Sequence, residues 1–500
     1  MRLYFFGHDC RYAAEQTLLM LYPGEKPQYP EGEPSGDRVE LRVKRGERFT
    51  VCTALLVRGR QSFPGRAAVL NSRLGNESDR VKYTNRIVKL AFYRAALNSG
   101  LPKPEWGCLS GVRPVKLMDE YLRLGLSPVR AKERFKEQYM VSEARAGLCL
   151  SAALATRAAL GGLEPGDVCL YVGIPFCPTR CSYCSFVSQS VEKSMKLIEP
   201  FMEALMLDIA ATAAEVRRTG LRPVSIYIGG GTPTTLSAGQ LDRLCSRLEA
   251  EFDLSALREF TVEAGRPDTI TMDKLRTLRA HGVDRISVNP QTMSDSVLEA
   301  IGRRHSARDI VEALELVRSC GGFSVNMDLI AGLPTDTAAG FSKTLDRVLK
   351  LGPENITVHT LSLKRGSGLA LSGGGLPEAG EVRSMLDESM SRLRQEGYTP
   401  YYLYRQKNMA GGFENTGWAK SGEENLYNIC IMEELCSIIA MGAGGSTKLV
   451  SGDAKRIKRM IAPKYPQEYI KTIAGICAGK ERIGEFFAVQ PEGDQLPDGR

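Results

Sequence analysis

The sequence predicts an α/β fold with a parallel sheet, because short apolar segments alternate with amphipathic helical segments from Val168 onward. Six strands are expected at 169–174, 225–228, 259–262, 285–288, 324–329 and 355–360. The helices between them are expected at 192–219, 238–251, 272–280, 307–320 and 338–351. Parallel strands joined by helices need right-handed crossovers, so this order indicates a partial or complete barrel or an open doubly wound sheet.

Polar and glycine-rich residues follow each predicted strand, where both kinds of fold place their ligand site. The first strand runs into a loop with three cysteines, and the second into Gly229-Gly-Gly-Thr-Pro-Thr234. The other four strands end at Glu263, at Asn289 and Gln291, at Asp328, and at His359, Thr360 and Ser362. Each residue alone has an ordinary explanation as a cap or turn, but the agreement across six strands predicts a site at this edge.

The 500 residues exceed one ordinary core, and we expect three domains. Residues 1–162 are predicted to form an α+β domain, with strands at 2–6, 39–43 and 48–57 and helices at 13–21, 80–99 and from 127 onward. Within it, segment 106–116 is interpreted as a loop, with an anion-binding turn as the alternative. A core domain at 163–376 and a mixed α/β extension at 377–500 follow, the latter with helices at 380–396 and 427–439.

The composition is that of an ordinary globular protein, with 43% hydrophobic and 25% charged residues. A net charge of +8 over this length suits an anionic ligand and does not indicate nucleic acid. The apolar run at 1–7 is short and is followed by Asp9 and Arg11, so we expect no signal peptide, no membrane span and a cytoplasmic protein. Seven single cysteines are interpreted as buried free thiols in a reducing compartment: Cys149, Cys169, Cys245, Cys320, Cys430, Cys436 and Cys477.

The densest chemical signal is the cysteine loop, with Cys177, Cys181 and Cys184 directly after the first core strand. Thiolates are the ligands of iron-sulfur clusters, and this spacing lets one loop hold a cluster. Three ligands for a four-iron cube leave one iron open to a small molecule. A zinc site, a disulfide and a chance arrangement are the alternatives, but a structural zinc site wants a second pair of ligands, and the four histidines are isolated: His8, His281, His305 and His359.

Three further groups suit a ligand. The glycine-rich turn 229–234 lacks the lysine of a phosphate-binding P-loop, so it is either a plain turn or a platform for close backbone approach. Glu263 can accept hydrogen bonds from ribose hydroxyls, and Arg303 can pair with a carboxylate, although ordinary surface positions are the alternative for both. Asp328 interrupts an apolar strand end, which favours a functional or networked carboxylate.

These motifs resemble those of radical S-adenosylmethionine (SAM) enzymes over roughly residues 168–404. The segments Tyr171-Val-Gly-Ile-Pro-Phe-Cys177, Gly229–Thr234 and Asp328-Leu-Ile-Ala-Gly-Leu-Pro334 resemble the oxygen-independent coproporphyrinogen III oxidases. Segments 401–408 and 427–434 are similar to the HemZ-type dehydrogenase branch. The resemblance implies a (β/α)6 partial TIM-like barrel, with Cys177, Cys181 and Cys184 holding a [4Fe-4S] cluster.

The resemblance also implies the residues around the cofactor and the substrate. Tyr171, Gly230 and Glu263 would contact S-adenosylmethionine. A second S-adenosylmethionine or the substrate would be surrounded by Tyr183, Gly231, Thr232, Gln291, Arg303, Asp328 and Ser362. Four cations are candidates for pairing with substrate propionates: Lys364, Arg365, Arg405 and Lys407.

The implied activity belongs to haem biosynthesis. It is the oxidative decarboxylation of two propionates of coproporphyrinogen III to vinyl groups, giving protoporphyrinogen IX. The implied partners are this tetrapyrrole and an electron donor such as flavodoxin or ferredoxin, without nucleic acid; the sequence leaves the oligomeric state open, with a monomer as one alternative.

Two positions depart from the better-known oxidases. Gly173 stands where they have His, and Phe186 where they have a fourth Cys, which resembles the haem-chaperone branch. A haem chaperone with His359 as an axial ligand, and a radical enzyme with another substrate, are therefore the alternative functions.

Overall fold

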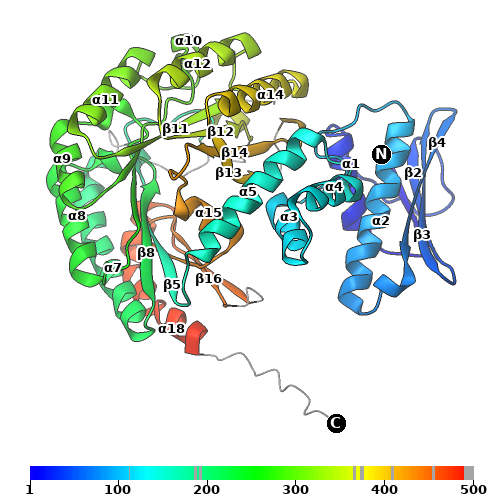
Figure 1. Ribbon diagram of the computed structural model, residues 1–500, viewed down its shortest axis with the longest axis horizontal. Coiled ribbons are helices and arrows are strands. Elements are labelled where there is room, and N and C mark those ends of the chain that lie inside the picture. The colour runs from blue at the N-terminus through cyan, green and yellow to red at the C-terminus, as the bar shows by residue number, and fades with distance from the viewer. Residues whose placement is uncertain are drawn as a thin grey trace. The chain divides into compact units, whose positions relative to one another are not determined.

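The computed structural model describes residues 1–488 except 112, 185–188, 191–193, 364–366, 372–376, 407–409 and 453–455 (Figure 1). The chain forms two compact units, of which the first contains Met1–Leu150 and Gly411–Phe413. The second contains Ser151–Ala410 and Glu414–Arg500. The division into domains at 1–162, 163–376 and 377–500 stays a prediction. None of the described helices is long and apolar enough to cross a membrane.

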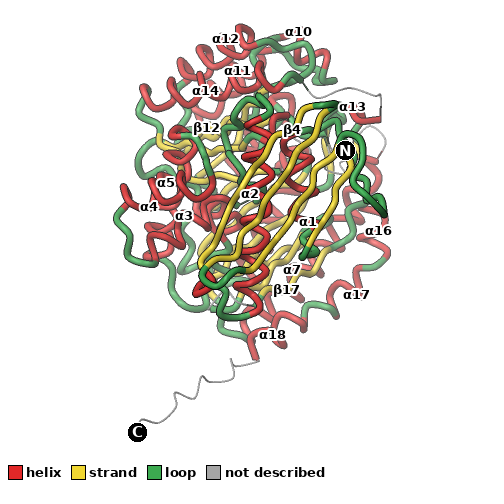
Figure 2. The backbone as a smooth tube through the Cα atoms, turned by 90° about the vertical axis from the view of Figure 1, so that its right-hand side faces the viewer, coloured by secondary structure: helices red, strands yellow, loops and turns green. Residues whose placement is uncertain are grey.

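The first unit is an α+β structure built on a four-stranded sheet. Its strands are β1 (Arg2–Phe6), β2 (Arg38–Arg45), β3 (Phe49–Arg58) and β4 (Gln61–Leu70), paired in that order. Its helices are α1 (Arg11–Leu21), α2 (Glu77–Asn98), α3 (Pro114–Arg123), α4 (Pro128–Tyr139) and the first part of α5 (Glu143–Gly161). The predicted hairpin 39–43/48–57 is confirmed as β2 and β3, whereas β4 and α3 were not predicted. Figure 2 shows the four strands side by side in front of α1 and α2.

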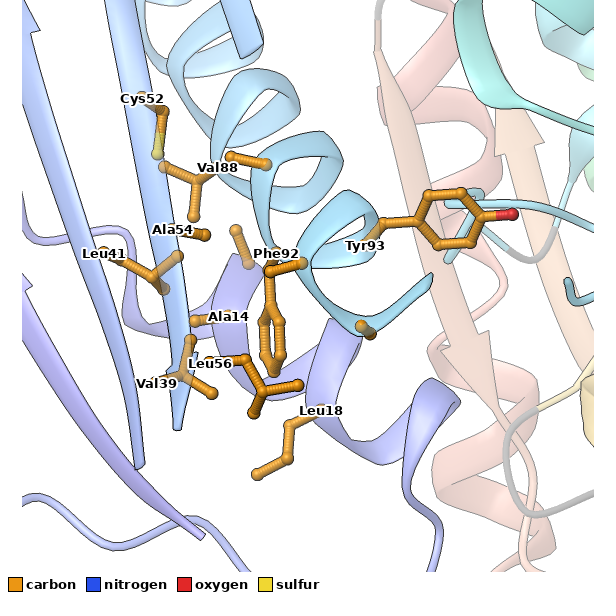
Figure 3. Packing of buried hydrophobic residues seen from close by; sticks show 14 of the residues in the cluster. Ala14, Leu18, Val39, Leu41, Cys52, Ala54, Leu56, Val88, Phe92 and Tyr93 are labelled. Carbon is orange, nitrogen blue, oxygen red and sulfur yellow. The ribbon is translucent and has the colours of Figure 1, made fainter. Parts of the chain in front are cut away.

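The core of this unit lies between the sheet and helix α2. Val88 and Phe92 point from α2 toward Leu41 and Leu56 on the strands, and all four are fully buried (Figure 3). Alternate strand residues face this layer, because successive side chains of a strand point to opposite faces. Gly65 of β4 lets the helix approach, since a Cβ there would lie 2.1 Å from a backbone oxygen of α2.

The second unit contains the predicted parallel sheet. The six predicted strands are neighbours in an eleven-stranded sheet and all run parallel. They are β5 (Asp167–Ile174), β8 (Arg222–Gly230), β9 (Glu259–Glu263), β10 (Arg285–Ser287), β11 (Ser324–Ala331) and β12 (Asn355–Thr360). Among the described strands, β13 and β17 form free edges, so the sheet is an open, partial barrel and not a closed one.

Helices cover the outer side of this curved sheet (Figure 1). They include α7 (Ile198–Arg218), α8 (Ala238–Glu251), α9 (Met272–Ala280), α11 (Ala307–Cys320) and α12 (Ala338–Leu351). The bounds predicted for α8, α9, α11 and α12 are confirmed. Each of these four begins after a Ser or Thr whose hydroxyl accepts a hydrogen bond from a first-turn backbone N–H, which is a strong start signal in a sequence.

The carboxyl-terminal segment extends both sides of the parallel core. Strand β14 (Glu414–Ala419) pairs antiparallel with β12, and β13 (Thr399–Arg405) pairs antiparallel with β14 at the edge of the sheet. Helix α14 (Ala379–Gln395) precedes them, and α15 (Leu426–Glu433) follows. On the other side, β15 (Ser437–Gly442) adds parallel to β5, followed by β16 (Ser446–Val450) and β17 (Ile457–Ile461). Helices α16 (Pro466–Lys471), α17 (Ile473–Ala478) and α18 (Glu481–Ala488) end the described chain.

The helix predicted at 427–439 is wrong in its second half. Helix α15 ends at Glu433, Glu434 adopts a left-handed conformation with φ of 57°, and residues 437–442 form β15. Every residue of β15 is buried. A strand buried on both faces has a continuous apolar sequence without alternation, and such a run looks the same as a buried helix.

Candidate functional site

The three cysteines of the loop lie directly after β5. Cys177 belongs to the short strand β6 (Phe176–Cys177), and its Sγ lies 3.4 Å from the Oγ1 of Thr232. Cys181 is buried, and the N–H of Cys184 donates to its carbonyl at 3.1 Å. Three cysteine thiols within one loop are a ligand set that an iron-sulfur cluster takes.

The glycine-rich turn packs against this loop. The N–H of Gly231 donates to the carbonyl of Ile174 at 2.8 Å, and that of Thr232 to the carbonyl of Phe176 at 2.7 Å. A Cβ at position 231 would lie 2.4 Å from the Phe176 oxygen, and Gly230 adopts a φ of +108°. There is no room for a side chain at these positions. The backbone of the glycine-rich turn therefore lies in direct contact with the backbone of the cysteine loop.

Glu263 lies at the end of β9 beneath the turn. The hydroxyl of Tyr227 donates to its Oε1 at 2.7 Å, and a Cβ at Gly229 would lie 3.0 Å from its carboxyl carbon. Burial raises the pKa of Glu263 to about 7, although the bond from Tyr227 opposes this rise. With this pKa, the Glu263 carboxyl ionises readily when a ligand supplies further hydrogen-bond donors to it.

Tyr171 belongs to an aromatic stack beside Glu263. Its ring stacks on Tyr227 at 6.3 Å and on Tyr427 at 6.1 Å, and the last two stack at 4.5 Å. Tyr171 lies on β5, Tyr227 on β8 and Tyr427 on α15. The stack fixes the wall of the site by rigid apolar contact.

Asp328, which lies within β11 three residues before its last residue, takes part in a polar network. The amide of Asn326 donates to its Oδ1 at 2.9 Å, and His359 Nε2 lies 3.7 Å from its Oδ2. Burial acts to raise the pKa of Asp328, but the bonds from His359 and Asn326 outweigh it and hold the pKa below the ordinary value. The carboxylate is therefore charged and fixed in position, as the interpretation of a networked group requires.

A cavity of about 340 Å³ opens at this edge of the sheet. Six of the predicted site residues line it: Tyr183, Cys184, Glu263, Gln291, Asp328 and Ser362. The seven others are not part of its lining: Tyr171, Gly230, Gly231, Thr232, Arg303, Cys177 and Cys181. Of the alternative axial ligand and the predicted cations, His359 lines the cavity, Arg405 is buried on β13, and Lys364, Arg365 and Lys407 lie outside the described residues, as does Phe186.

Several buried polar atoms at this edge have no hydrogen-bond partner among the described residues, and two of them belong to predicted site residues. Arg303 donates to the carbonyl of Asn289 at 2.6 Å and to the hydroxyl of Tyr183 at 3.4 Å, but its Nε has no acceptor. The Oε1 of Gln291 has no donor, and this residue adopts a φ of 66°, which is unusual outside glycine. Such groups fit a site that a polar ligand completes.

Sequence reasoning missed much of the far wall of the cavity. Tyr402 and Tyr404 on β13, Asn415 on β14, and Asn428 and Met432 on α15 complete the lining. They come from a segment that folds back beside β12, after a long connection. In the sequence, the aromatic run 401–404 served only as a family resemblance. Successive side chains of a strand point to opposite faces, and this alternation could have placed Tyr402 and Tyr404 on the same face.

The Gly173 departure has a structural cause. A Cβ at this position would lie 2.6 Å from the carbonyl oxygen of Ala443, directly after β15. Reciprocally, a Cβ on Gly442 would lie 2.3 Å from the carbonyl of Gly173. The added strand β15 therefore occupies the space that a larger residue at 173 would need.

Comparisons with known proteins agree with this geometry. The profile of the Radical SAM superfamily matches residues 171–348. The chain is 38% identical over 370 residues to the oxygen-independent coproporphyrinogen-III oxidase-like protein HemZ of Bacillus subtilis (strain 168), covering 73% of this chain and 74% of HemZ. It is 30% identical over 305 residues to the heme chaperone HemW of the same organism, covering 59% of this chain and 76% of HemW. The structure of the coproporphyrinogen III oxidase HemN from Escherichia coli has a TM-score of 0.51 at 23% identity, over 67% of this chain and 82% of HemN.

The partial barrel and its cysteine loop are thus those of a radical SAM protein. Within that superfamily, the chain belongs to the family of oxygen-independent coproporphyrinogen III oxidase-like proteins. Membership confirms the predicted fold class, and it implies a [4Fe-4S] cluster and S-adenosylmethionine as cofactors. The three cysteines of one loop and the unpartnered Nε of Arg303 and Oε1 of Gln291 fit this pair of cofactors.

Proposed function

We propose that the chain oxidatively decarboxylates two propionate side chains of coproporphyrinogen III to vinyl groups, giving protoporphyrinogen IX. The observation that carries the proposal is the cavity at the carboxyl edge of the sheet, which is lined by Cys184 of the cluster loop and by the Asp328–His359 pair. When bound, the cluster and S-adenosylmethionine supply a 5'-deoxyadenosyl radical, which takes hydrogen from carbon. Each propionate loses one hydrogen atom, one electron and carbon dioxide. The electrons for cofactor cleavage come from a donor such as flavodoxin or ferredoxin.

The roles of the residues follow from their chemistry. Cys177, Cys181 and Cys184 hold the cluster as thiolates. Tyr171, Gly230 and Glu263 contact S-adenosylmethionine, with Glu263 accepting from its ribose hydroxyls. The residues around the substrate or a second S-adenosylmethionine are Tyr183, Gly231, Thr232, Gln291, Arg303, Asp328 and Ser362.

The walls of the cavity suit a flat substrate with polar substituents. Tyr402 and Tyr404 stack at 6.4 Å and present flat apolar faces, which suit a tetrapyrrole ring. Asn326, Asp328 and Thr357 are already hydrogen-bonded to one another, so they orient a polar substituent without rearranging.

The test is product analysis in an anaerobic assay. The reconstituted protein is incubated with S-adenosylmethionine, a reductant and coproporphyrinogen III, and products are separated by chromatography. We expect protoporphyrinogen IX, carbon dioxide and 5'-deoxyadenosine. Cys181→Ser removes all three, whereas Cys245→Ser, a buried thiol of helix α8, retains them. Formation of 5'-deoxyadenosine without a vinyl product would show that the substrate is a different one.

A second function is favoured by one observation, the position of His359 in the cavity wall. A haem chaperone would use this imidazole as an axial ligand, and the relative HemW carries that name. A haem titration distinguishes the two functions. A Soret shift that disappears in His359→Ala, together with no turnover of coproporphyrinogen III, would favour the chaperone, and an unshifted spectrum would exclude it.

A further inference from the structure

Three buried cysteines outside the cluster loop face one another. The Sγ of Cys169 lies 3.6 Å from that of Cys436, and these two and the Sγ of Cys430 all lie within 4.8 Å of one another. All three residues are buried and free of disulfides. The prediction of buried free thiols is confirmed at these positions, but the sequence did not predict that the three lie together; we name this set the thiol triad.

The triad is assembled by the segment that the sequence misassigned. Cys169 lies on β5, Cys430 on α15, and Cys436 directly before β15. The left-handed Glu434 turns the chain back, and the N–H of Leu435 donates to the carbonyl of Cys430 at 3.4 Å. Parallel pairing of β15 with β5 then sets Cys436 beside Cys169. Three separate elements thus converge on one point.

The triad is distinct from the cluster loop. Cys169 is near the beginning of β5, whereas the loop follows its end at Ile174. At about 3.3 Å per residue, this part of the strand separates the two by about 16 Å. Its surroundings are apolar and include Val224, Leu426 and Ile438.

The spacing of the sulfurs matches one metal ion. An ion about 2.3 Å from each of three sulfurs sets them about 4 Å apart, which agrees with the observed separations. A disulfide would require about 2.05 Å. Soft thiolate ligands in an apolar pocket select soft ions, and hard oxygen-seeking ions are disfavoured.

We propose that Cys169, Cys430 and Cys436 bind a single thiophilic metal ion of the Zn²⁺ or Cu⁺ class. The ion replaces thiol protons, which leave to solvent. It fastens α15 and β15 to β5, and so holds the strand that packs against Gly173. The inference does not depend on the substrate that is proposed above.

The experiment uses the full chain with Cys177, Cys181 and Cys184 replaced by alanine, so that the iron cluster contributes no metal or thiols. This parent is prepared under reducing conditions and titrated in separate arms with Zn²⁺ and Cu⁺ against a chelating indicator. We expect one equivalent of tight binding in at least one arm. Adding Cys430→Ala should weaken metal binding by at least about 100-fold. Loss of a residue that only hydrogen-bonds to a metal ligand costs about 10- to 100-fold, so loss of a ligand itself should cost more. The matched control Cys245→Ala, also fully buried, should bind as the parent does.

Three results would overturn the proposal: no binding in either arm, equal binding with Cys430→Ala, or a Cys169–Cys436 disulfide found by mass spectrometry in the reduced protein. Where Cys430→Ala fails to fold by circular dichroism, X-ray absorption of the metal-loaded parent replaces it. Three sulfurs at about 2.3 Å support the site, and a shell of nitrogen and oxygen alone refutes it.

Discussion

The raised pKa of Glu263 predicts that S-adenosylmethionine binding releases a proton. With a pKa of about 7, about half of the Glu263 carboxyls carry a proton at pH 7. In the proposed site, the ribose hydroxyls of S-adenosylmethionine would donate to the charged form of Glu263, so binding would lower its pKa and release the proton to solvent. At pH 7 we therefore expect release of about half a proton from Glu263 for each ligand bound.

The same linkage sets the direction of the pH dependence. The ionised fraction of Glu263 rises from about one tenth at pH 6 to about nine tenths at pH 8. Affinity for S-adenosylmethionine should accordingly increase by about tenfold over this range. Glu263→Gln keeps an acceptor for the Tyr227 hydroxyl but does not titrate. The part of the proton release and of the pH-dependent affinity that comes from Glu263 should therefore be absent in this variant.

The assay is isothermal titration calorimetry of the oxidised, cluster-loaded protein in buffers of different ionisation enthalpy. The amino group of the ligand also titrates near this pH, but it does so in both proteins and cancels in their difference. A difference of about half a proton between wild type and Glu263→Gln at pH 7 supports the reasoning. Equal release by the two proteins would refute the role of Glu263 at the ribose.

Three other substitutions test particular contacts. Gly231→Ala places a Cβ 2.4 Å from the Phe176 oxygen, so we expect loss of S-adenosylmethionine binding and lower iron content; a fully loaded variant would contradict this. Lys480→Met leaves Asp208 without the cation that lies 2.7 Å away in a buried pair, so denaturant titration should show a loss of about 3 to 5 kcal/mol. Phe92→Ala opens a cavity in the first unit, and should cost about 3 to 5 kcal/mol in the unfolding of that unit.

The barrel could be predicted because its signals are local. Four of the outer helices, α8, α9, α11 and α12, start at a hydroxyl cap, and each strand is a short apolar run followed by a polar or glycine residue. Because parallel strands end at the same edge, their last residues had to meet, and six of the predicted site residues share one cavity. Neither step required knowledge of distant contacts.

The carboxyl-terminal segment could not be predicted in the same way. The run Ser437–Gly442 is mostly apolar and shows no alternation of polar and apolar residues. Only its pairing with β5 identifies it as a strand. Tyr402 and Tyr404 line the cavity because β13 pairs with β14, which in turn pairs with β12, a strand far from it in sequence. The thiol triad stayed hidden for the same reason, since single cysteines at 169, 430 and 436 show no spacing motif.

The pairing of β15 also changes what the Gly173 departure means. A glycine where better-known oxidases have His first indicated the haem-chaperone branch. In this fold, however, the carbonyl of Ala443 lies 2.6 Å from where a Cβ at 173 would be, so the strand alone requires glycine. A residue that packing already explains carries no information about haem or porphyrinogen. The choice between the two functions therefore depends on the groups that line the cavity, above all His359 and Asp328, and on what the protein does with coproporphyrinogen III.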